Sequence, residues 1–539
     1  MKKTKIAFYI LSLIVISNGI FIRFWHLDTI PPGIHYDEAF NGLNAIGADE
    51  SGHYRMFYAE NFGREGLHIN VIAFFIQLFG ISNFSLRLAN ASWGALTLIG
   101  FFFLLKQLKF SPLAVLAGTF MLAFSFWHLD FSRTAYRGIM VPLLEIWIFY
   151  FFLKGLEAVR HKNFYFIISA ILLGLGFYTY IAFRIFPLAV IILAIAYLLT
   201  RKEFLRNYWK SALIFFLVSL IAAAPILIYF TSHKKDMIGR SETVSIFDDP
   251  ATPWTVSFKK SFVDHMGAFF IHGDNNPRYN YNSQPLLPPV WQLFFFLGFI
   301  ISFKEIIGTL LKRQPSEWFY VSVLAQSTFW IMFIPGVLSI EGIPHTLRII
   351  GTIPGVFIMA ILPLEYLLDR RGKRKQLFKE NKMSGWRVKN LSLLIFGTIV
   401  LMAISGLIQS YVYFGAWAKD LRTLGGYEKK LYDFGQLIRE LPVEKNNYLI
   451  LTSQTAISGD HKESSFKTTE YIAYPKIKEY LFFKPISKSF SVNCEENIRI
   501  IFFESDRWLR DQYAVLCPNL KIRFAVPKNG LYGFWVIEN

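Results

Sequence analysis

Long apolar segments separated by short polar ones make up most of the chain as far as residue 414. A helix needs roughly 20 apolar residues to cross a bilayer. This pattern predicts an all-α polytopic membrane protein with about 11 transmembrane helices, the number of segments that approach this length. They cover residues 6–24, 84–105, 112–129, 139–157, 163–181, 184–200, 210–230, 289–311, 316–336, 346–368 and 391–414.

Basic residues between these segments predict the orientation of the helices. Runs of Lys and Arg mark cytoplasmic loops, and here they fall on alternate connections and at the N-terminus. The N-terminus is therefore expected in the cytoplasm, and loops 25–83 and 231–288 outside. The apolar stretch His68–Gly80 is short, which indicates an interfacial or broken helix. The basic runs are Lys2–Lys5, Lys106–Lys109, Lys154–Lys162, Arg201–Lys210, Lys304–Arg313 and Arg370–Lys389.

The pattern changes after the last apolar segment. An amphipathic stretch at Tyr427–Leu441 predicts a helix, and four short runs rich in β-formers predict strands. We therefore expect a transmembrane unit at 1–418 and a small extracytoplasmic α/β domain at 419–539. Its two cysteines, Cys494 and Cys517, are too few to establish a disulfide. The predicted strands are Tyr448–Thr452, Arg499–Glu504, Ile522–Val526 and Phe534–Glu538.

Composition supports a membrane protein and narrows its partners. Hydrophobic residues make up 53% of the chain and charged residues 17%, against about 25% charged in soluble domains. The net charge of +18 lies largely in the basic loops, so it reflects topology, and no nucleic-acid partner is expected. The sequence has no phosphate-binding glycine loop of the Walker type, which argues against ATP-driven transport.

An acidic pair, Asp37 and Glu38, follows the first apolar segment. A carboxylate at the membrane surface is costly unless it has a partner or a task. It can act as a general base on an incoming hydroxyl group. The alternative is structural, because either residue could cap a helix over Ala39–Ala48.

Farther along the same loop stand Arg64, Glu65 and His68. Arg64 can bind a phosphate through two parallel hydrogen bonds. Glu65 and His68 could orient Arg64 or hold a divalent metal ion, although two ligands do not make a metal site. The alternative is a surface ion pair at an interfacial helix.

Two arginines, Arg133 and Arg137, occupy the second outer loop. Spaced four apart, they would share one face of a helix. Arginines on the outer side run against the positive-inside trend, so we expect an anionic partner, either Asp130 and Glu38 or a lipid phosphate. The alternative is that both extend to ordinary lipid headgroups.

The long outer loop is dense in polar and aromatic side chains, notably Asp274, Asn275, Arg278 and Tyr279. These residue types suit the hydroxyl groups and ring faces of a sugar. Such residues are also common in ordinary turns, which is the alternative.

A further candidate lies at the outer end of the tenth apolar segment. His345 and Arg348 stand close together there, and Arg348 is another cation on the expected outer side. Glu341, seven residues earlier, is its expected partner.

Several of these motifs resemble the GT-C glycosyltransferases, in particular the group of protein O-mannosyltransferases and aminoarabinose transferases. The resemblance covers about residues 5–370. It implies a polyprenyl-phosphate sugar donor, an inverting transfer, and an active site at the outer face of the membrane. Besides the acidic pair, the motifs are Leu78–Leu88, Phe131–Arg137, Gly174–Tyr180 and His345–Arg348.

The resemblance also implies roles for residues. Asp37 matches the proposed catalytic base of the family's first-loop motif, and Glu38 matches its neighbour. The pair Arg64-Glu65 stands where the aminoarabinose transferases carry Glu-Lys. Those enzymes have a further acid near the start of the helix after the second outer loop. Here the nearest acid is Asp130, which puts a second catalytic carboxylate and a metal site in doubt.

These observations give a hypothesis for a multi-pass protein of the cell membrane. It transfers a hexose or pentose from a polyprenyl-phosphate donor to a hydroxyl of a protein, lipid or glycan. Asp37 and Glu38 are the expected catalytic residues. Arg64, Arg133, Arg137 and Arg348 are expected to bind the donor phosphate. Glu65, His68, Asp130, Asp274, Asn275, Arg278, Tyr279 and His345 are expected to bind substrate.

Two alternatives belong to other functional classes. A transporter or lipid-sugar flippase would need ionisable groups deep within the spans, and Glu145 is the clearest candidate. A scaffold protein whose C-terminal domain binds partners would leave the polar outer loops unexplained. No metal ligand set is assigned, and the sugar and the acceptor stay open.

Overall fold

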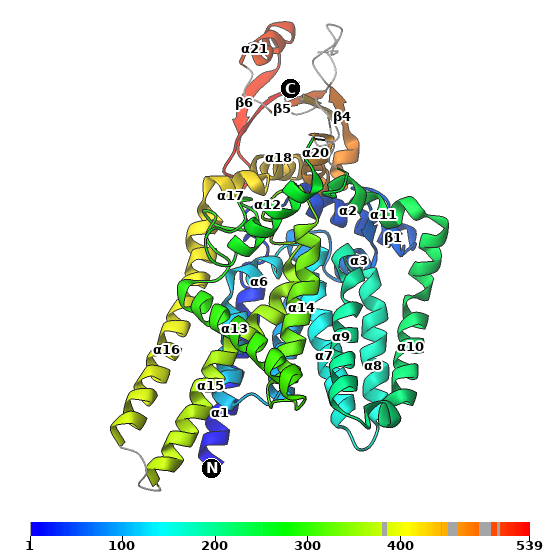
Figure 1. Ribbon diagram of the computed structural model, residues 1–539. Helices are drawn as coiled ribbons and strands as arrows, with labels where there is room; N and C mark the ends of the chain where they lie inside the picture. Colours follow the sequence, from blue (N-terminus) through cyan, green and yellow to red (C-terminus); the bar gives the residue numbers. More distant parts are fainter. Residues whose placement is uncertain are drawn as a thin grey trace. The chain divides into compact units, whose positions relative to one another are not determined.

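The computed structural model describes residues 2–248, 251–379, 385–443, 445–450, 462–483, 497–503 and 507–539. Most of these residues are helical (Figure 1). The chain forms two compact units. Unit 1 comprises residues 1–25, 54–68 and 88–417, and unit 2 comprises residues 26–53, 69–87 and 418–539. Cys494, residues 451–452 and Glu504, which figured in the expectations above, lie outside the described residues.

Unit 1 is a bundle of long apolar helices. Within the described residues, nine helical segments are long and apolar enough to cross a membrane. The helices are α1 (Lys2–Phe24), α4 (Asn83–Gln107), α5 (Pro112–Phe124), α6 (Phe126–Phe131), α7 (Met140–Glu157), α8 (Lys162–Leu175), α9 (Pro187–Thr200), α10 (Phe204–Ser232), α11 (Lys234–Val244), α12 (Trp254–Gly267), α13 (Pro289–Lys312), α14 (Phe319–Val337), α15 (Ile353–Lys379) and α16 (Gly385–Tyr411).

The prediction of a multi-span α-helical protein is confirmed, but two of the expected spans fall short. The segment 112–129 is divided into α5 and α6 at Ser125, whose extended backbone interrupts the helix. The segment 163–181 leaves the α-helix at Leu175 and continues in 3₁₀ turns. A hydropathy count does not detect either break, because a single residue such as Ser125 or Gly176 hardly changes the mean hydropathy of a long apolar segment.

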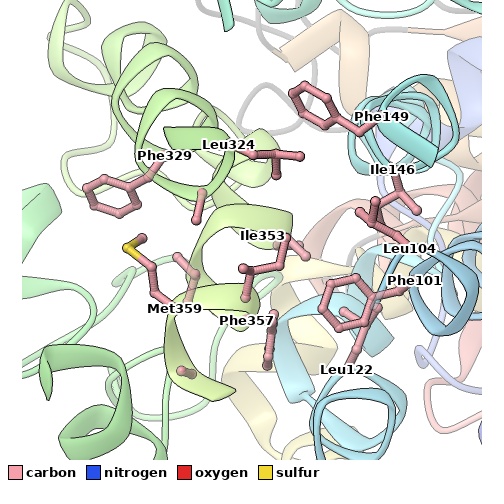
Figure 2. Close-up of a cluster of buried hydrophobic side chains, with 14 of the residues drawn as sticks. Phe101, Leu104, Leu122, Ile146, Phe149, Leu324, Phe329, Ile353, Phe357 and Met359 are labelled. Carbon is pink, nitrogen blue, oxygen red and sulfur yellow. The ribbon is translucent and has the colours of Figure 1, made fainter. Parts of the chain in front are cut away.

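The core of unit 1 consists of tightly interlocked apolar and aromatic side chains. Figure 2 shows residues of α4, α5, α7, α14 and α15 that meet in it, including Phe101, Leu122, Ile146, Leu324 and Phe357. In a bilayer such packing stabilises through van der Waals contact, since lipid is as apolar as the core.

Helices α13 and α15 approach especially closely. A Cβ atom added at Gly298 would lie 1.7 Å from the Met359 carbonyl oxygen, so only glycine fits at this crossing. Small residues at such crossings are typical of helix pairs in membranes.

One end of unit 1 carries most of its irregular structure. The connections 132–139, 176–186, 233–288 and 338–349 lie there (Figure 1), and we call it the loop-rich end. A two-stranded hairpin, β1 (Phe57–Tyr58) and β2 (Arg64–Glu65), also belongs to unit 1.

Unit 2 is built on a five-stranded sheet in the order β4-β3-β5-β7-β6. Strand β3 pairs in parallel with β4 and β5, and β7 pairs antiparallel with β5 and β6. The strands are β3 (Asn446–Ile450), β4 (Tyr480–Phe483), β5 (Ile498–Phe502), β6 (Lys521–Ala525) and β7 (Phe534–Glu538), and the helices are α17 (Leu421–Gly426), α18 (Lys429–Glu440), α20 (Lys462–Ala473) and α21 (Arg507–Leu516).

The predicted mixed α/β fold of this region is confirmed, and each of the four predicted strands overlaps an observed one. The predicted helix at 427–441 is α18. Strand β4 was not predicted because its run is only four residues long.

Unit 2 also includes segments from the N-terminal part of the chain. Helix α2 (Tyr36–Ser51) packs on α20, and Gly42 lies so close to the Tyr471 ring that an added Cβ would be 2.4 Å from it. Helix α3 (Leu67–Phe79) is the short apolar segment expected at 68–80. The acidic pair is therefore positioned by a helix that packs against the C-terminal residues.

Candidate functional site

The acidic pair lies in the first turn of α2, and its two carboxylates have different surroundings. Glu38 accepts a hydrogen bond from the His35 backbone N–H (3.2 Å), which closes a capping box. Glu38 also pairs with Arg87, Oε2 to Nε 3.2 Å, and neither side chain is exposed. Glu38 thus takes part in capping, as the structural alternative expected, but at position N3 of a helix that begins at Tyr36 and has His35 as its N-cap residue.

Asp37 is the accessible member of the pair. Its side chain is 31% exposed, and its Oδ2 lies 3.3 Å from Nδ1 of His35. It stands at the N-terminus of a helix, where the backbone dipoles favour a negative charge. Of the two carboxylates, Asp37 is the one that an incoming hydroxyl group can reach.

In unit 1, a buried carboxylate joins two arginines at the loop-rich end. Glu65 is 2% exposed, and its oxygens lie 3.2 Å from Nε of Arg137 and 2.9 Å from an Nη of Arg184. Arg137 also donates to the Gly63 carbonyl (3.3 Å) and lies over the Tyr180 ring. Burial raises the pKa of Tyr180, with nearby arginines acting in the opposite direction.

We call this group the Glu65 cluster: Arg64, Glu65, Arg137 and Arg184. Arg64 is buried and donates from Nε to the Glu60 carbonyl (3.2 Å). The Glu65 carboxylate is therefore paired with two guanidinium groups, those of Arg137 and Arg184, which leaves a positive excess. His68, expected beside Arg64, is buried, and its Nε2 lies 3.3 Å from the Ala135 carbonyl oxygen.

The sequence did not single out Arg184. It was counted as the first residue of the expected span 184–200, whereas it lies in a 3₁₀ segment before α9. The sequence did contain one signal for Arg184. It is a cation next to the very short predicted outer connection at residues 182–183, on the side of the membrane where basic residues are scarce.

The prediction that Arg133 and Arg137 share a helical face is wrong. The chain leaves the helix after Phe131, and Arg137 begins a separate 3₁₀ turn. Arg133 donates to the carbonyls of Ile22 (2.6 Å) and Trp25 (2.7 Å), among others. The anionic partner of Arg137 is Glu65, in place of the expected Asp130 or Glu38. Asp130 and Arg133 are both fully buried.

Asp274 links the long loop to the segment before α15. Its Oδ2 accepts hydrogen bonds from the backbone N–H (3.0 Å) and hydroxyl (3.1 Å) of Thr346, and its Oδ1 accepts from the Asn276 N–H (2.8 Å). In the same loop Arg278 donates to the Tyr136 hydroxyl (3.2 Å), and Asn275 accepts from Ser283 (2.6 Å).

Asp274 should give the protein a recognisable pH dependence. Burial raises its carboxyl pKa from 3.8 to about 6, although the Thr346 and Asn276 hydrogen bonds act in the opposite direction. A carboxyl whose pKa is raised by folding favours the fold when protonated. Relative to Asp274→Asn, the wild-type unfolding temperature in detergent should therefore rise as pH falls from 7 through about 6 toward 4. A difference that is constant over this range would contradict the assignment.

His345 is positioned by a second histidine. His265 Nε2 accepts from the His345 backbone N–H (3.0 Å), while its Nδ1 lies 2.8 Å from the Ser261 carbonyl oxygen. Burial lowers the pKa of His265 to about 4, so His265 is neutral with its proton on Nδ1. The His345 ring lies 5.5 Å from the Tyr279 ring.

The expected pairing of Arg348 with Glu341 is confirmed. Arg348 donates to the Glu341 carboxylate (2.7 Å) and carbonyl (2.9 Å), and Arg240 donates to the same carboxylate (2.8 Å). Glu341 thus joins two arginines as Glu65 does, but its side chain is 52% exposed.

An apolar groove of about 400 Å³ lies among α7, α8, α9 and α10. Phe177 and Leu227 line the part of the groove that is nearest the loop-rich end of unit 1. Phe177 packs on a small cluster that contains Phe230, and the Arg184 guanidinium lies 4.9 Å above the Phe230 ring. A chain of contacts through Phe177 and Phe230 therefore links the groove to Arg184 of the Glu65 cluster. Other lining residues are Phe152, Phe166, Val190, Phe215, Phe216 and Leu220.

No group of three or more His, Cys, Asp or Glu side chains is arranged to hold a metal ion in the part of the chain that the structure describes.

This fold is that of the GT-C membrane glycosyltransferases. The crystal structure of ArnT from Cupriavidus metallidurans bound to undecaprenyl phosphate matches with a TM-score of 0.50 at 14% identity, covering 100% of this chain and 98% of that one. The archaeal oligosaccharyltransferase AglB from Archaeoglobus fulgidus, in complex with an inhibitory peptide and a dolichol-phosphate, matches with a TM-score of 0.50 at 15% identity. That match covers 88% of this chain and 65% of AglB.

Sequence comparison agrees with the fold. Residues 67–229 match the sequence model of the dolichyl-phosphate-mannose-protein mannosyltransferase family. No curated protein matches the chain by sequence. The predicted resemblance to the GT-C superfamily is confirmed, and the chain is a multi-pass membrane protein with this fold.

Proposed function

We propose that the protein transfers a sugar from a polyprenyl-phosphate donor to an acceptor hydroxyl group, on the extracytoplasmic side of the membrane. The observation that carries this proposal is the apolar groove, which contacts through Phe177 and Phe230 link to Arg184 of the Glu65 cluster. A prenyl chain needs an apolar surface within the membrane, and its phosphate needs cations at the boundary. The ArnT structure that shares this fold holds a lipid of this class.

The excess positive charge of the Glu65 cluster suits the donor phosphate. Arg137 and Arg184 are fixed by Glu65, so their guanidinium groups are oriented before a ligand arrives. Charge that develops on the leaving phosphate during transfer is stabilised by such preorganised cations. Arg64 and Arg348 are further candidates, and Arg133, whose guanidinium is bonded to backbone carbonyls, is a weaker one.

Asp37 is the proposed general base. It takes the proton of the acceptor hydroxyl as that oxygen bonds to the anomeric carbon. The bond from this carbon to the phosphate oxygen breaks, and polyprenyl phosphate leaves with the electron pair. Attack opposite the leaving group inverts the anomeric configuration. In this proposal Asp274, Asn275, Arg278, Tyr279 and His345 contribute to substrate binding from the loop-rich end.

A lipid-sugar flippase is the second candidate. Glu145 in α7 is fully buried, and neither of its carboxylate oxygens has a hydrogen-bond partner among the described residues. Such an intramembrane acid is a recognised feature of coupled transporters. Movement of a labelled lipid-linked sugar across vesicles without release of polyprenyl phosphate would favour this alternative.

A substitution in the groove tests the proposed donor site. Ala212 lines the groove and is exposed in it, so Ala212→Trp should fill the space without disturbing the helix. We expect at least a tenfold rise in KM for a long-chain polyprenyl-phosphate sugar, and little change with a short, water-soluble analogue. Leu213→Trp is the matched control, because Leu213 is also exposed but does not line the groove. Equal KM values for both variants would exclude the groove as the donor site.

A further inference from the structure

Unit 2 contains a polar cleft of about 450 Å³, formed entirely by its own residues. This volume lies within the range of small-molecule sites, roughly 300–1,000 Å³. The walls are the segment before α2, the start of α4, one face of α18, and the turn before β7. We call it the unit 2 cleft.

The polar side chains of the cleft are fixed in place. Asn83 Nδ2 donates to the Tyr432 hydroxyl (3.0 Å) and to the Asp28 carbonyl (3.0 Å), and Gln436 Nε2 donates to the same hydroxyl (3.1 Å). Asp433 forms an ion pair with Lys429 and accepts a hydrogen bond from the backbone N–H of Leu531 (2.8 Å). A framework bonded in this way is preorganised, which lowers the entropy cost of binding a ligand.

One buried acceptor in the cleft has no hydrogen-bond partner in the part of the chain that the structure describes. Asn83 is 6% exposed, and its Oδ1 has no hydrogen-bond partner among the described residues. The two bonds made by Nδ2 fix the orientation of the amide, so Oδ1 is the acceptor atom. Leaving a buried acceptor unsatisfied destabilises the protein, because the acceptor has lost its bond to water. A ligand hydroxyl that donates to Oδ1 would remove this destabilisation.

The remaining chemistry of the cleft narrows the ligand class. Pro32, Ile81 and Leu531 supply apolar walls, while the exposed rim carries Asp28, Arg439 and Lys528. Carboxylates and cations are both present, so the site lacks the strong positive excess that a phosphate group selects. Alternating apolar surface and hydrogen-bonding groups match the C–H faces and hydroxyls of a saccharide.

We propose that the unit 2 cleft binds a saccharide portion of the acceptor. Gly33 connects the cleft with the acidic motif, because it lines the cleft and its carbonyl accepts a hydrogen bond from Arg87, the partner of Glu38. A saccharide bound there contacts the segment that leads to Asp37. The role of this saccharide as the acceptor rests on the proposed transferase function. Its binding to the cleft can be measured without any transfer reaction.

The test is direct binding of short oligosaccharides to the purified full-length protein in detergent. The protein is first screened against a glycan array of neutral and uronic-acid-containing oligosaccharides and, in parallel, against a peptide library. The oligosaccharide that binds best is the probe, and calorimetry then measures its affinity. Thr29→Trp fills the cleft from an exposed position and should weaken binding at least tenfold. Ser51→Trp is the matched control: like Thr29 it is an exposed hydroxyl residue of unit 2 bonded to a nearby carbonyl, and it does not line the cleft.

Lys528→Ala, at the rim of the same cleft, provides a second and milder variant and should weaken binding several-fold. Binding of peptides in place of oligosaccharides, binding of neither, or unchanged affinity in Thr29→Trp would overturn the inference. Saccharide binding by a protein that consumes no lipid-linked sugar would leave this inference intact and refute the proposed function instead.

Discussion

Asp37→Asn should slow sugar transfer by orders of magnitude while leaving the fold intact. Loss of a positioned general base costs typically 10²–10⁴-fold in rate, and we expect kcat to fall within this range with little change in KM for the donor. Asparagine preserves the size of the side chain and remains compatible with the start of α2. The measurement is release of polyprenyl phosphate by purified protein under saturating donor.

Asp49→Asn is the matched control for this variant. Asp49 lies in the same helix, α2, near its opposite end, so it tests whether removing a carboxylate from this helix is harmful in itself. We expect Asp49→Asn to keep near-normal kcat. If Asp37→Asn keeps it as well, the assigned base is wrong.

Glu65→Gln should destabilise the protein strongly. The substitution leaves the Arg137 and Arg184 side chains, which are only 15% and 17% exposed, without the carboxylate that neutralises them. Breaking a buried ion pair on one side costs about 3–5 kcal/mol. We expect a clear fall in the unfolding temperature in detergent, together with weaker donor binding because the two guanidinium groups lose their fixed orientation.

Glu341→Gln provides an internal comparison for that loss. Glu341 also joins two arginines, Arg240 and Arg348, but its side chain is 52% exposed. Exposed pairs contribute about 0–1 kcal/mol because water screens them. Equal destabilisation by Glu65→Gln and Glu341→Gln would show that burial does not determine the contribution of the Glu65 cluster.

Most of the helical architecture follows from one property of the sequence, the length of its apolar segments. The length of an apolar segment does not show where the helix within it is interrupted. The extended backbone at Ser125 separates α5 from α6, although the segment reads as one continuous apolar run. The same limit applies to Arg133 and Arg137: their spacing of four fits a helix, but the chain between them is not helical.

The roles of the candidate site residues depend on tertiary contacts that the sequence does not show. The acidic pair was identified from its place after the first span, but only tertiary contacts distinguish its members. Arg87 lies far from Glu38 in sequence and neutralises it, whereas Asp37 stays accessible. Arg184 was missed for a related reason, because its partner Glu65 comes from a distant hairpin.

The most direct test of the proposed function is to incubate the purified protein with a panel of polyprenyl-phosphate sugars and acceptors and to measure released polyprenyl phosphate. The proposal predicts that one donor is consumed, that its sugar appears on the acceptor with inverted anomeric configuration, and that Asp37→Asn slows both by orders of magnitude. Consumption of no donor, or movement of lipid-linked sugar across vesicles without release of polyprenyl phosphate, would contradict it.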